Sequence, residues 1–116
     1  MNDLEWAEAY NAGREDALDG TLAKITAWAE ARNLIEGSSA QAQCVKLGEE
    51  FGELCGGIAK NYKYVISDSI GDMVVVLAIL AKQCGLDLAE CVELAYHEIK
   101  DRKGRMENGM FIKEGD

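Results

Sequence analysis

The side chains best suited to chemistry are carboxylates, and they are grouped in two stretches of the sequence. Glu49, Glu50 and Glu53 form the first group, and Asp68 and Asp72 form the second. If each stretch is helical, Glu50 and Glu53 lie about 60° apart around the axis, and Asp68 lies one turn before Asp72 on the same face. Donor sets that contain only oxygen favour Mg²⁺, Mn²⁺ or Ca²⁺ over zinc.

Asp72 is the residue that a purely structural role explains least well. It directly precedes a run of nine apolar residues, and on a helix it would project between Val75, Val76 and Ile79. A helix that is apolar all round is buried on all sides, so a carboxylate there must be neutralised, paired or bound to a cation. A place near a helix N-terminus explains Asp68 but not Asp72. We therefore expect a metal site rather than a set of caps and ion pairs.

The elements that must position these carboxylates are predicted to be helices, because caps and glycines separate amphipathic segments. The predicted helices cover approximately residues 3–17, 21–33, 38–60, 67–85 and 87–104. Their expected N-caps include Ser38, Ser67 and Asp87. The last segment has the clearest apolar stripe, and Asn108-Gly109 after it is a strong hairpin signal. The sequence thus predicts one all-α domain, a bundle of four to five helices with a short C-terminal β-hairpin.

The helix predicted for residues 38–60 has two distinct faces. Its expected core face is centred on Phe51 and contains Cys44, Leu47, Phe51, Leu54, Cys55 and Ile58. On the opposite flank, glycine recurs every four residues, at Gly48, Gly52 and Gly56. Glycine lowers helix stability, so this stripe predicts the close approach of another helix. The four cysteines include no C-x-x-C pair, and we expect them to be reduced and packed in the core: Cys44, Cys55, Cys84 and Cys91.

Composition and charge exclude several classes of protein. The 116 residues fit one domain, and the formal charge of -9 argues against a polynucleotide partner. Metal ions can still lie between an acidic protein and a nucleotide. The N-terminus lacks the pattern of a signal peptide, and the apolar run is shorter than the about 20 residues of a membrane span. We expect a cytoplasmic protein without a membrane partner. The only histidine, His97, follows Leu94 by three residues, which excludes the Glu-x-x-His motif of di-iron bundles.

The two carboxylate stretches resemble the MazG family of all-α nucleoside triphosphate pyrophosphohydrolases. They read EEFGEL at 49–54 and IGD at 70–72, whereas the family pattern is E-x-x-E on one helix and E-x-x-D on the next. Ser69 occupies the position of the second glutamate, and Asp68 is the expected substitute. The resemblance covers about residues 27–113, and it includes the KDRKG ending of the last helix. We accordingly expect residues 1–18 to be a helical N-terminal extension and 19–116 a MazG-like helical domain.

The resemblance implies the hydrolysis of a (deoxy)nucleoside triphosphate to the monophosphate and pyrophosphate. It implies a Mg²⁺ cofactor, for which Mn²⁺ can substitute, with four ligands: Glu50, Glu53, Asp68 and Asp72. By the same analogy, Glu49 would orient or deprotonate the attacking water. The expected substrate-binding residues are Lys100, Arg102 and Lys103 for the outer phosphates and Trp28 for the base. Families of this type build the site between subunits, so a homodimer or homotetramer is expected. The apolar helix predicted for residues 67–85 independently favours an oligomer.

Other interpretations of the same residues stay open. The cations at the end of the last helix are equally well explained as partners of the helix dipole, and Trp28 as a core residue. Ser69 in place of glutamate favours a non-catalytic interaction or regulatory module that retains the helical fold. A metal hydrolase acting on another phosphorylated metabolite would use the same scaffold. Metal-dependent release of pyrophosphate from a nucleotide panel separates these functions.

Overall fold

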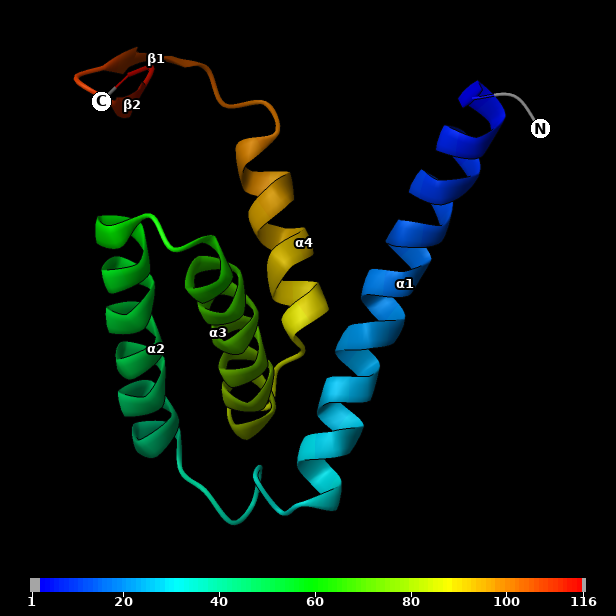
Figure 1. Cartoon of the computed structure of the whole chain (residues 1–116), viewed down its shortest axis with the longest axis vertical. Coiled ribbons are helices and arrows are strands. Elements are labelled where there is room, and N and C mark those ends of the chain that lie inside the picture. Colours follow the sequence, from blue (N-terminus) through cyan, green and yellow to red (C-terminus); the bar gives the residue numbers. More distant parts are fainter. Residues whose placement is uncertain (1–2, 116) are drawn as a thin grey trace.

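The computed structural model describes the backbone of residues 3–115 and the side chains of residues 5 and 17–115. Within these residues the chain forms four α-helices followed by a two-stranded antiparallel sheet (Figure 1). The elements are α1 (Asp3–Ala31), α2 (Ala40–Lys60), α3 (Lys63–Gln83), α4 (Leu88–Ile99), β1 (Gly104–Glu107) and β2 (Met110–Lys113). The predicted helical fold class and the C-terminal hairpin are confirmed.

The first two predicted helices are a single helix, so the predicted break at Gly20 is wrong. Helix α1 continues through Gly20, where an added Cβ would have no neighbour within 4 Å. Glycine inside a helix lowers stability by only about 1 kcal/mol, which a helix of this length can tolerate. The expected boundary between residues 1–18 and the rest of the chain falls inside α1.

Helices α2 and α3 lie side by side as an antiparallel pair, with α2 on the outer side of the molecule (Figure 1). The connection between them is short because Asn61 adopts a left-handed conformation with φ of 56°, and its N–H donates to the carbonyls of Gly57 and Ile58. Gly57 is buried where α3 begins, and a Cβ there would lie 3.0 Å from Val65 Cγ1. The predicted glycine stripe does not make this contact: Gly48, Gly52 and Gly56 have no such neighbours within the protomer.

The helix starts follow the predicted caps only in part. Asp87 caps α4 as expected, since its side chain accepts a hydrogen bond from Ala89 N at 2.8 Å. Helix α2 is capped by Ser39, which accepts from Ala42 N, and not by Ser38, whose hydroxyl accepts from Gln43 Nε2. Helix α3 begins at Lys63, one turn before the predicted cap Ser67. It starts earlier because the left-handed residue before Tyr62 reverses the chain without a side-chain cap.

Helix α3 supplies most of the core of the protomer. Among the side chains that the structure describes, the buried apolar ones are Ala29 of α1 and Val76, Ala78 and Ile79 of α3. By length and composition α3 is also apolar enough to cross a membrane, with a mean hydropathy of 1.8. Its most apolar window is 22% buried inside the structure, and α3 contacts α1, α2 and α4.

The predicted core face of α2 is covered only in part, since Leu47 and Leu54 are half-buried. Phe51 and Ile58 are 55% and 61% exposed, and instead Glu50 and Gly57 are the buried residues of this helix. The cysteines are free, but Cys44, Cys55 and Cys84 are exposed rather than packed in a core. Helix α2 is rotated so that the flank carrying Glu50 and Gly57, rather than Phe51, is covered, and the part of its apolar face around Phe51 is exposed.

The C-terminal hairpin agrees with the sequence signal. Strands β1 and β2 pair in the register Gly104 with Lys113 and Glu107 with Met110. Asn108 and Gly109 form the two-residue turn, with φ of 52° and 77°. Two consecutive positive φ values are those of a type I′ turn, whose twist matches that of the strands.

Candidate functional site

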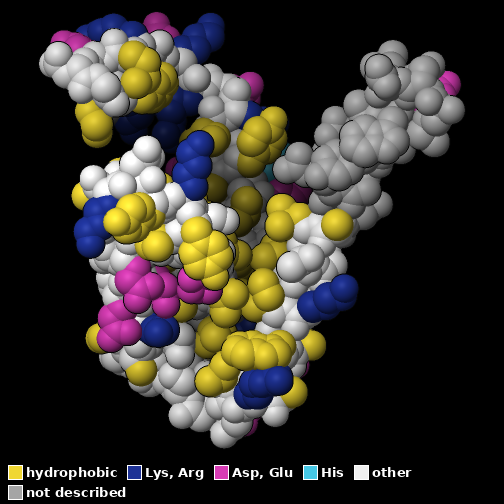
Figure 2. Space-filling model, viewed as in Figure 1, with side chains coloured by type: hydrophobic (Ala, Val, Ile, Leu, Met, Phe, Trp, Pro, Cys, Tyr) yellow, Lys and Arg dark blue, Asp and Glu magenta, His cyan; other side chains and the backbone are white. Residues whose placement is uncertain are grey.

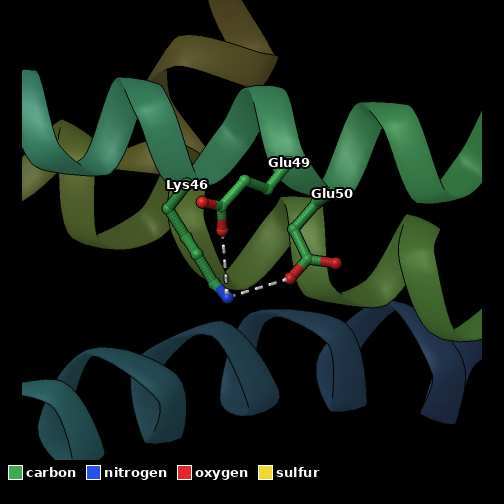
Figure 3. A network of polar contacts seen from close by, with 3 residues as sticks. All are labelled: Lys46, Glu49 and Glu50. Carbon is green, nitrogen blue, oxygen red and sulfur yellow. Dashed lines mark ion pairs between the residues drawn. The ribbon is translucent and has the colours of Figure 1, made fainter.

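Glu50 is the acidic side chain that the fold buries most strongly among those described. It is 5% exposed, and its Oε1 lies 3.5 Å from Lys46 Nζ. The same ammonium group lies 3.7 Å from Glu49 Oε2, so one lysine is shared by two carboxylates (Figure 3). Glu50 Oε2 is buried and has no hydrogen-bond partner. The site therefore contains a carboxylate oxygen that lacks a protein donor.

Lys46 is itself held by these carboxylates. A hydrogen bond from its ammonium group to Glu50 and the charges of Glu50 and Glu49 raise the pKa of Lys46 above its ordinary value of 10.5. The side chain of Lys46 is 53% exposed, so solvent can replace it at little cost. Lys46 is thus a weakly held cation beside Glu50.

Asp72 on α3 lies within electrostatic reach of Glu50 on α2. Burial is the main cause that raises the pKa of Asp72 above its ordinary value of 3.8. The negative charges of Asp68 and Glu50 raise the pKa further, while Lys46 opposes them. The predicted grouping of Asp68 with Asp72 is therefore present, and the two helices bring it close to Glu50.

Glu53 and Asp68 line a pocket between the end of α2 and the start of α3. Its volume is about 380 Å³. The same pocket is lined by Lys60, Tyr62 and Tyr64 at the helix connection, and by Ser69. Ser69 is 1% exposed and its hydroxyl has no hydrogen-bond partner. Ser69 therefore lines the same pocket as two predicted ligands, Glu53 and Asp68, with a hydroxyl group that makes no hydrogen bond.

Oxygen donors such as these suit a hard divalent cation, although the described side chains are spread apart. Within the described side chains, no three His, Cys, Asp or Glu residues converge closely enough to hold one ion. Carboxylate oxygens are nevertheless the ligands of Mg²⁺, which keeps several waters and needs few protein ligands. The unpartnered Glu50 oxygen and the disfavoured charge of Asp72 are both consistent with a cation between α2 and α3.

The predicted substrate cations lie apart from the carboxylates. Arg102 and Lys103 line a separate open pocket of about 600 Å³ together with Glu98, Asp101, Lys113 and Glu114. Lys100 is the exposed C-cap of α4. Trp28 lies on α1 and is 44% exposed, with the Arg32 guanidinium 4.8 Å from its ring centroid. In this protomer Trp28 is neither a core residue nor part of the carboxylate pocket.

Sequence reasoning missed Lys46 and the pocket residues Tyr62 and Tyr64. Lys46 had a detectable signal, since it precedes Glu49 and Glu50 by three and four residues, the spacing of ion pairs on a helix. The tyrosines had none, because they line the pocket only through the reversal at Asn61.

A relative of this chain is found in a bacteriophage. Over 70 residues the chain is 57% identical to the "Uncharacterized 18.2 kDa protein in rep-hol intergenic region" of Haemophilus phage HP1 (strain HP1c1). The match covers 60% of this chain and 43% of the relative, so the chain spans less than half of that protein's length. No protein-family model matches the chain, and no solved structure matches it.

Proposed function

We propose that this protein is a MazG-like, Mg²⁺-dependent nucleoside triphosphate pyrophosphohydrolase. The observation that carries the proposal is the unpartnered, buried Glu50 oxygen beside Asp72, whose charged form is disfavoured. A buried carboxylate oxygen without a donor is costly in a protein that only needs to be stable. A bound cation would remove that cost, and the resemblance of the two acidic stretches to the MazG pattern supplies the reaction.

The proposed ligands for Mg²⁺, or for Mn²⁺ in its place, come from both central helices. They are Glu50 and Glu53 of α2 and Asp68 and Asp72 of α3. When bound, the metal would supply positive charge to phosphate oxygens and stabilise the negative charge that develops during in-line displacement. The helices would fix the backbone positions of these carboxylates, and the side chains would have to converge on the ion when it binds.

The other residues are assigned by their exposure and position. Glu49 is 61% exposed beside Glu50, so it can accept a proton from an attacking water. The pocket of Glu53 and Asp68 would receive the phosphates. Lys100, Arg102, Lys103 and Trp28 remain proposed substrate-binding residues, and since the pocket of Arg102 and Lys103 is separate, they would act on the site of a neighbouring subunit.

The test is pyrophosphate release from a panel of ribo- and deoxyribonucleoside triphosphates with Mg²⁺ or Mn²⁺. Glu53→Gln should abolish release while leaving the helical circular dichroism intact, because it removes charge and not core volume. Glu93→Gln, an equally conservative change on α4, is the matched control and should retain full turnover. Absence of pyrophosphate from every substrate, or normal turnover in Glu53→Gln at saturating Mg²⁺, would contradict the proposal.

A non-catalytic interaction module is the second candidate function. The observation in its favour is Ser69, which is buried with an unused hydroxyl where the family has a glutamate. Nucleotide binding without turnover, measured by calorimetry in the presence of Mg²⁺, would support this alternative. Release of phosphate or pyrophosphate only from phosphorylated metabolites that are not nucleotides would support the other hydrolase considered above.

A further inference from the structure

We infer that the connection between α2 and α3 binds the nucleotide, with Lys60 contacting its phosphates and Tyr64 stacking on its base. The element is residues 60–64, here called the α2–α3 connection, and it contains two lysines and two tyrosines within five residues. Figure 2 shows basic and hydrophobic side chains at this connection and acidic side chains further along the same face of the two helices. The inference rests on the proposed function for the identity of the ligand.

The pocket at this connection contains opposite charges that do not neutralise one another. Glu53 and Asp68 line it together with Lys60. Lys60 nevertheless forms no ion pair with any acidic side chain that the structure describes. An ammonium group and carboxylates that share a pocket without contact leave room for a ligand that touches both. A phosphate that carries Mg²⁺ fits this arrangement, because the metal suits the carboxylates and the phosphate oxygens suit the lysine.

The wall of the pocket adds a buried polar group that has no partner. Ser69 is 1% exposed, and its hydroxyl makes no hydrogen bond. Buried hydroxyl groups are normally hydrogen-bonded, so this one points to a polar atom supplied by a ligand. Gly56 also lines the pocket, and an added Cβ there would meet no atom within 4 Å. The surface of α2 is therefore open to a ligand at this position.

The tyrosines lie at the outer edge of the pocket. Tyr62 and Tyr64 are 58% and 81% exposed, although both line it. Burial in the protein core therefore does not account for either ring. A nucleobase presents a flat face to any aromatic ring, and stacking on it requires no hydrogen-bond partner. The pocket volume of about 380 Å³ lies within the range of small-molecule sites, roughly 300–1,000 Å³.

The chain reversal at Asn61 holds this connection in place. Asn61 adopts a left-handed conformation with φ of 56°, and both its N–H and that of Tyr62 donate to the carbonyl of Gly57. Lys60 and Tyr64 thus extend from hydrogen-bonded backbone on the two sides of the turn. A connection that is ordered before binding loses less entropy when a nucleotide binds.

The test measures the affinity of the protein for two Mg²⁺ complexes by calorimetry. One probe is α,β-methylene-dATP, which has a base, and the other is tripolyphosphate, which has none. Tyr64→Ala should weaken binding of the nucleotide roughly fivefold or more and leave tripolyphosphate binding unchanged. Tyr64→Phe retains the ring and should bind both probes like the wild type. Tyr96→Ala, which removes an exposed tyrosine of α4, is the matched control and should change neither affinity.

Lys60→Gln should weaken binding of both probes about tenfold or more, because each carries the phosphates that the ammonium group contacts. Lys24→Gln removes an exposed lysine of α1 and is the matched control. Lys60 lies in the last turn of α2, where a cation also favours the helix dipole. If that were its only role, Lys60→Gln would lower the melting temperature and leave both affinities unchanged, which would overturn the inference.

Three further results would overturn it. They are wild-type affinity for the nucleotide in Tyr64→Ala, equal weakening of both probes by Tyr64→Ala, and a wild-type protein that binds neither probe. The proposed function fails separately. Binding in the expected order without pyrophosphate release from any triphosphate would contradict only the hydrolysis. Turnover with an unchanged KM in both Tyr64→Ala and Lys60→Gln would contradict only the present inference.

Discussion

Glu50 and Asp72 carry negative charge into the contact between α2 and α3, and their surroundings set how each behaves. Glu50 retains one ion pair, with the exposed Lys46, and one unpartnered oxygen. Asp72 lacks a comparable cation, because Lys46 offsets only part of the effects of burial and of its acidic neighbours. At the scale of the residue, the negative charges of the site therefore exceed the positive charge that Lys46 supplies.

The pH dependence of stability should report this imbalance at Asp72. Its pKa is raised, so the folded protein holds the proton more tightly than the unfolded chain does. The stabilisation is fully present below pH 3.8 and is lost as the pH rises through the raised pKa. In metal-free protein at pH 7, Asp72→Asn should raise the melting temperature by a few degrees and abolish pyrophosphate release.

The measurement is urea denaturation of both proteins between pH 3 and 8 in EDTA. The difference in unfolding free energy between Asp72→Asn and the wild type should grow across the raised pKa. Asp101→Asn, which changes an exposed aspartate, is the control and should leave the pH profile unchanged. A difference that stays constant with pH would show that the charge of Asp72 is not disfavoured in the fold.

Asp68 is the second residue with a specific prediction. If Asp68 takes the part of the second glutamate in the MazG pattern, Asp68→Asn should lower turnover at least tenfold, which is about 1.4 kcal/mol of transition-state stabilisation. Asparagine keeps the shape, so the melting temperature should stay near normal. Steady-state kinetics at saturating Mg²⁺ checks this. Full activity would mean that three carboxylates suffice and that Ser69 marks a reduced metal site.

At the scale of the element, the antiparallel α2–α3 pair decides where the carboxylates lie. Its close contact depends on Gly57, which faces Val65 and Ile66 at the start of α3. The left-handed Asn61 then reverses the chain within two residues. This tight connection brings the Glu53 and Asp68 side chains to one pocket, although 15 residues separate them in the sequence.

Substitution of Gly57 should test the helix contact directly. A Cβ there would lie 3.0 Å from Val65 Cγ1 and 3.3 Å from the backbone nitrogen of Ile66, and backbone cannot move as freely as a side chain. Gly57→Ala should therefore lower the free energy of unfolding by about 1–3 kcal/mol. Gly20→Ala, at an open helical position, should raise it by about 0.5–1 kcal/mol. Urea denaturation measures both, and equal effects would refute the close contact.

At the scale of the whole molecule, excess negative charge and open apolar surface are the two dominant features. The carboxylates between α2 and α3 repel one another without a metal, and this repulsion adds to a net charge of -9. Exposed apolar side chains on α1, α2 and α4 leave much of the protomer uncovered. A bound cation would offset the negative charge, and a second subunit would cover exposed apolar side chains.

Mg²⁺ should accordingly stabilise the whole protein. A ligand that binds only the folded state at 100 times its Kd adds about 2.7 kcal/mol to the free energy of unfolding. The melting temperature should rise between micromolar and millimolar Mg²⁺, measured by differential scanning fluorimetry. The Asp72→Asn protein should show a smaller rise, because it lacks one proposed ligand. A wild-type melting curve that is unchanged up to millimolar Mg²⁺ would argue strongly against the metal site.

The sequence by itself determined the helical class, the α4 cap at Asp87 and the hairpin at Asn108-Gly109. These features depend on local patterns: apolar periodicity, a side chain that accepts a backbone N–H, and two residues that tolerate positive φ. The pairing of Asp68 with Asp72 was predictable for the same reason, since one helical turn separates them.

Only the tertiary structure decided which face of each helix is covered. Periodicity shows that α2 has an apolar face but does not reveal what covers it, so Phe51 was expected in the core although it is exposed. The burial of Glu50 and the distance from the carboxylates to Arg102 and Lys103 also depend on how the helices pack. Packing is set by contacts between residues far apart in the chain, such as Gly57 against Val65 and Ile66, and no local pattern encodes them.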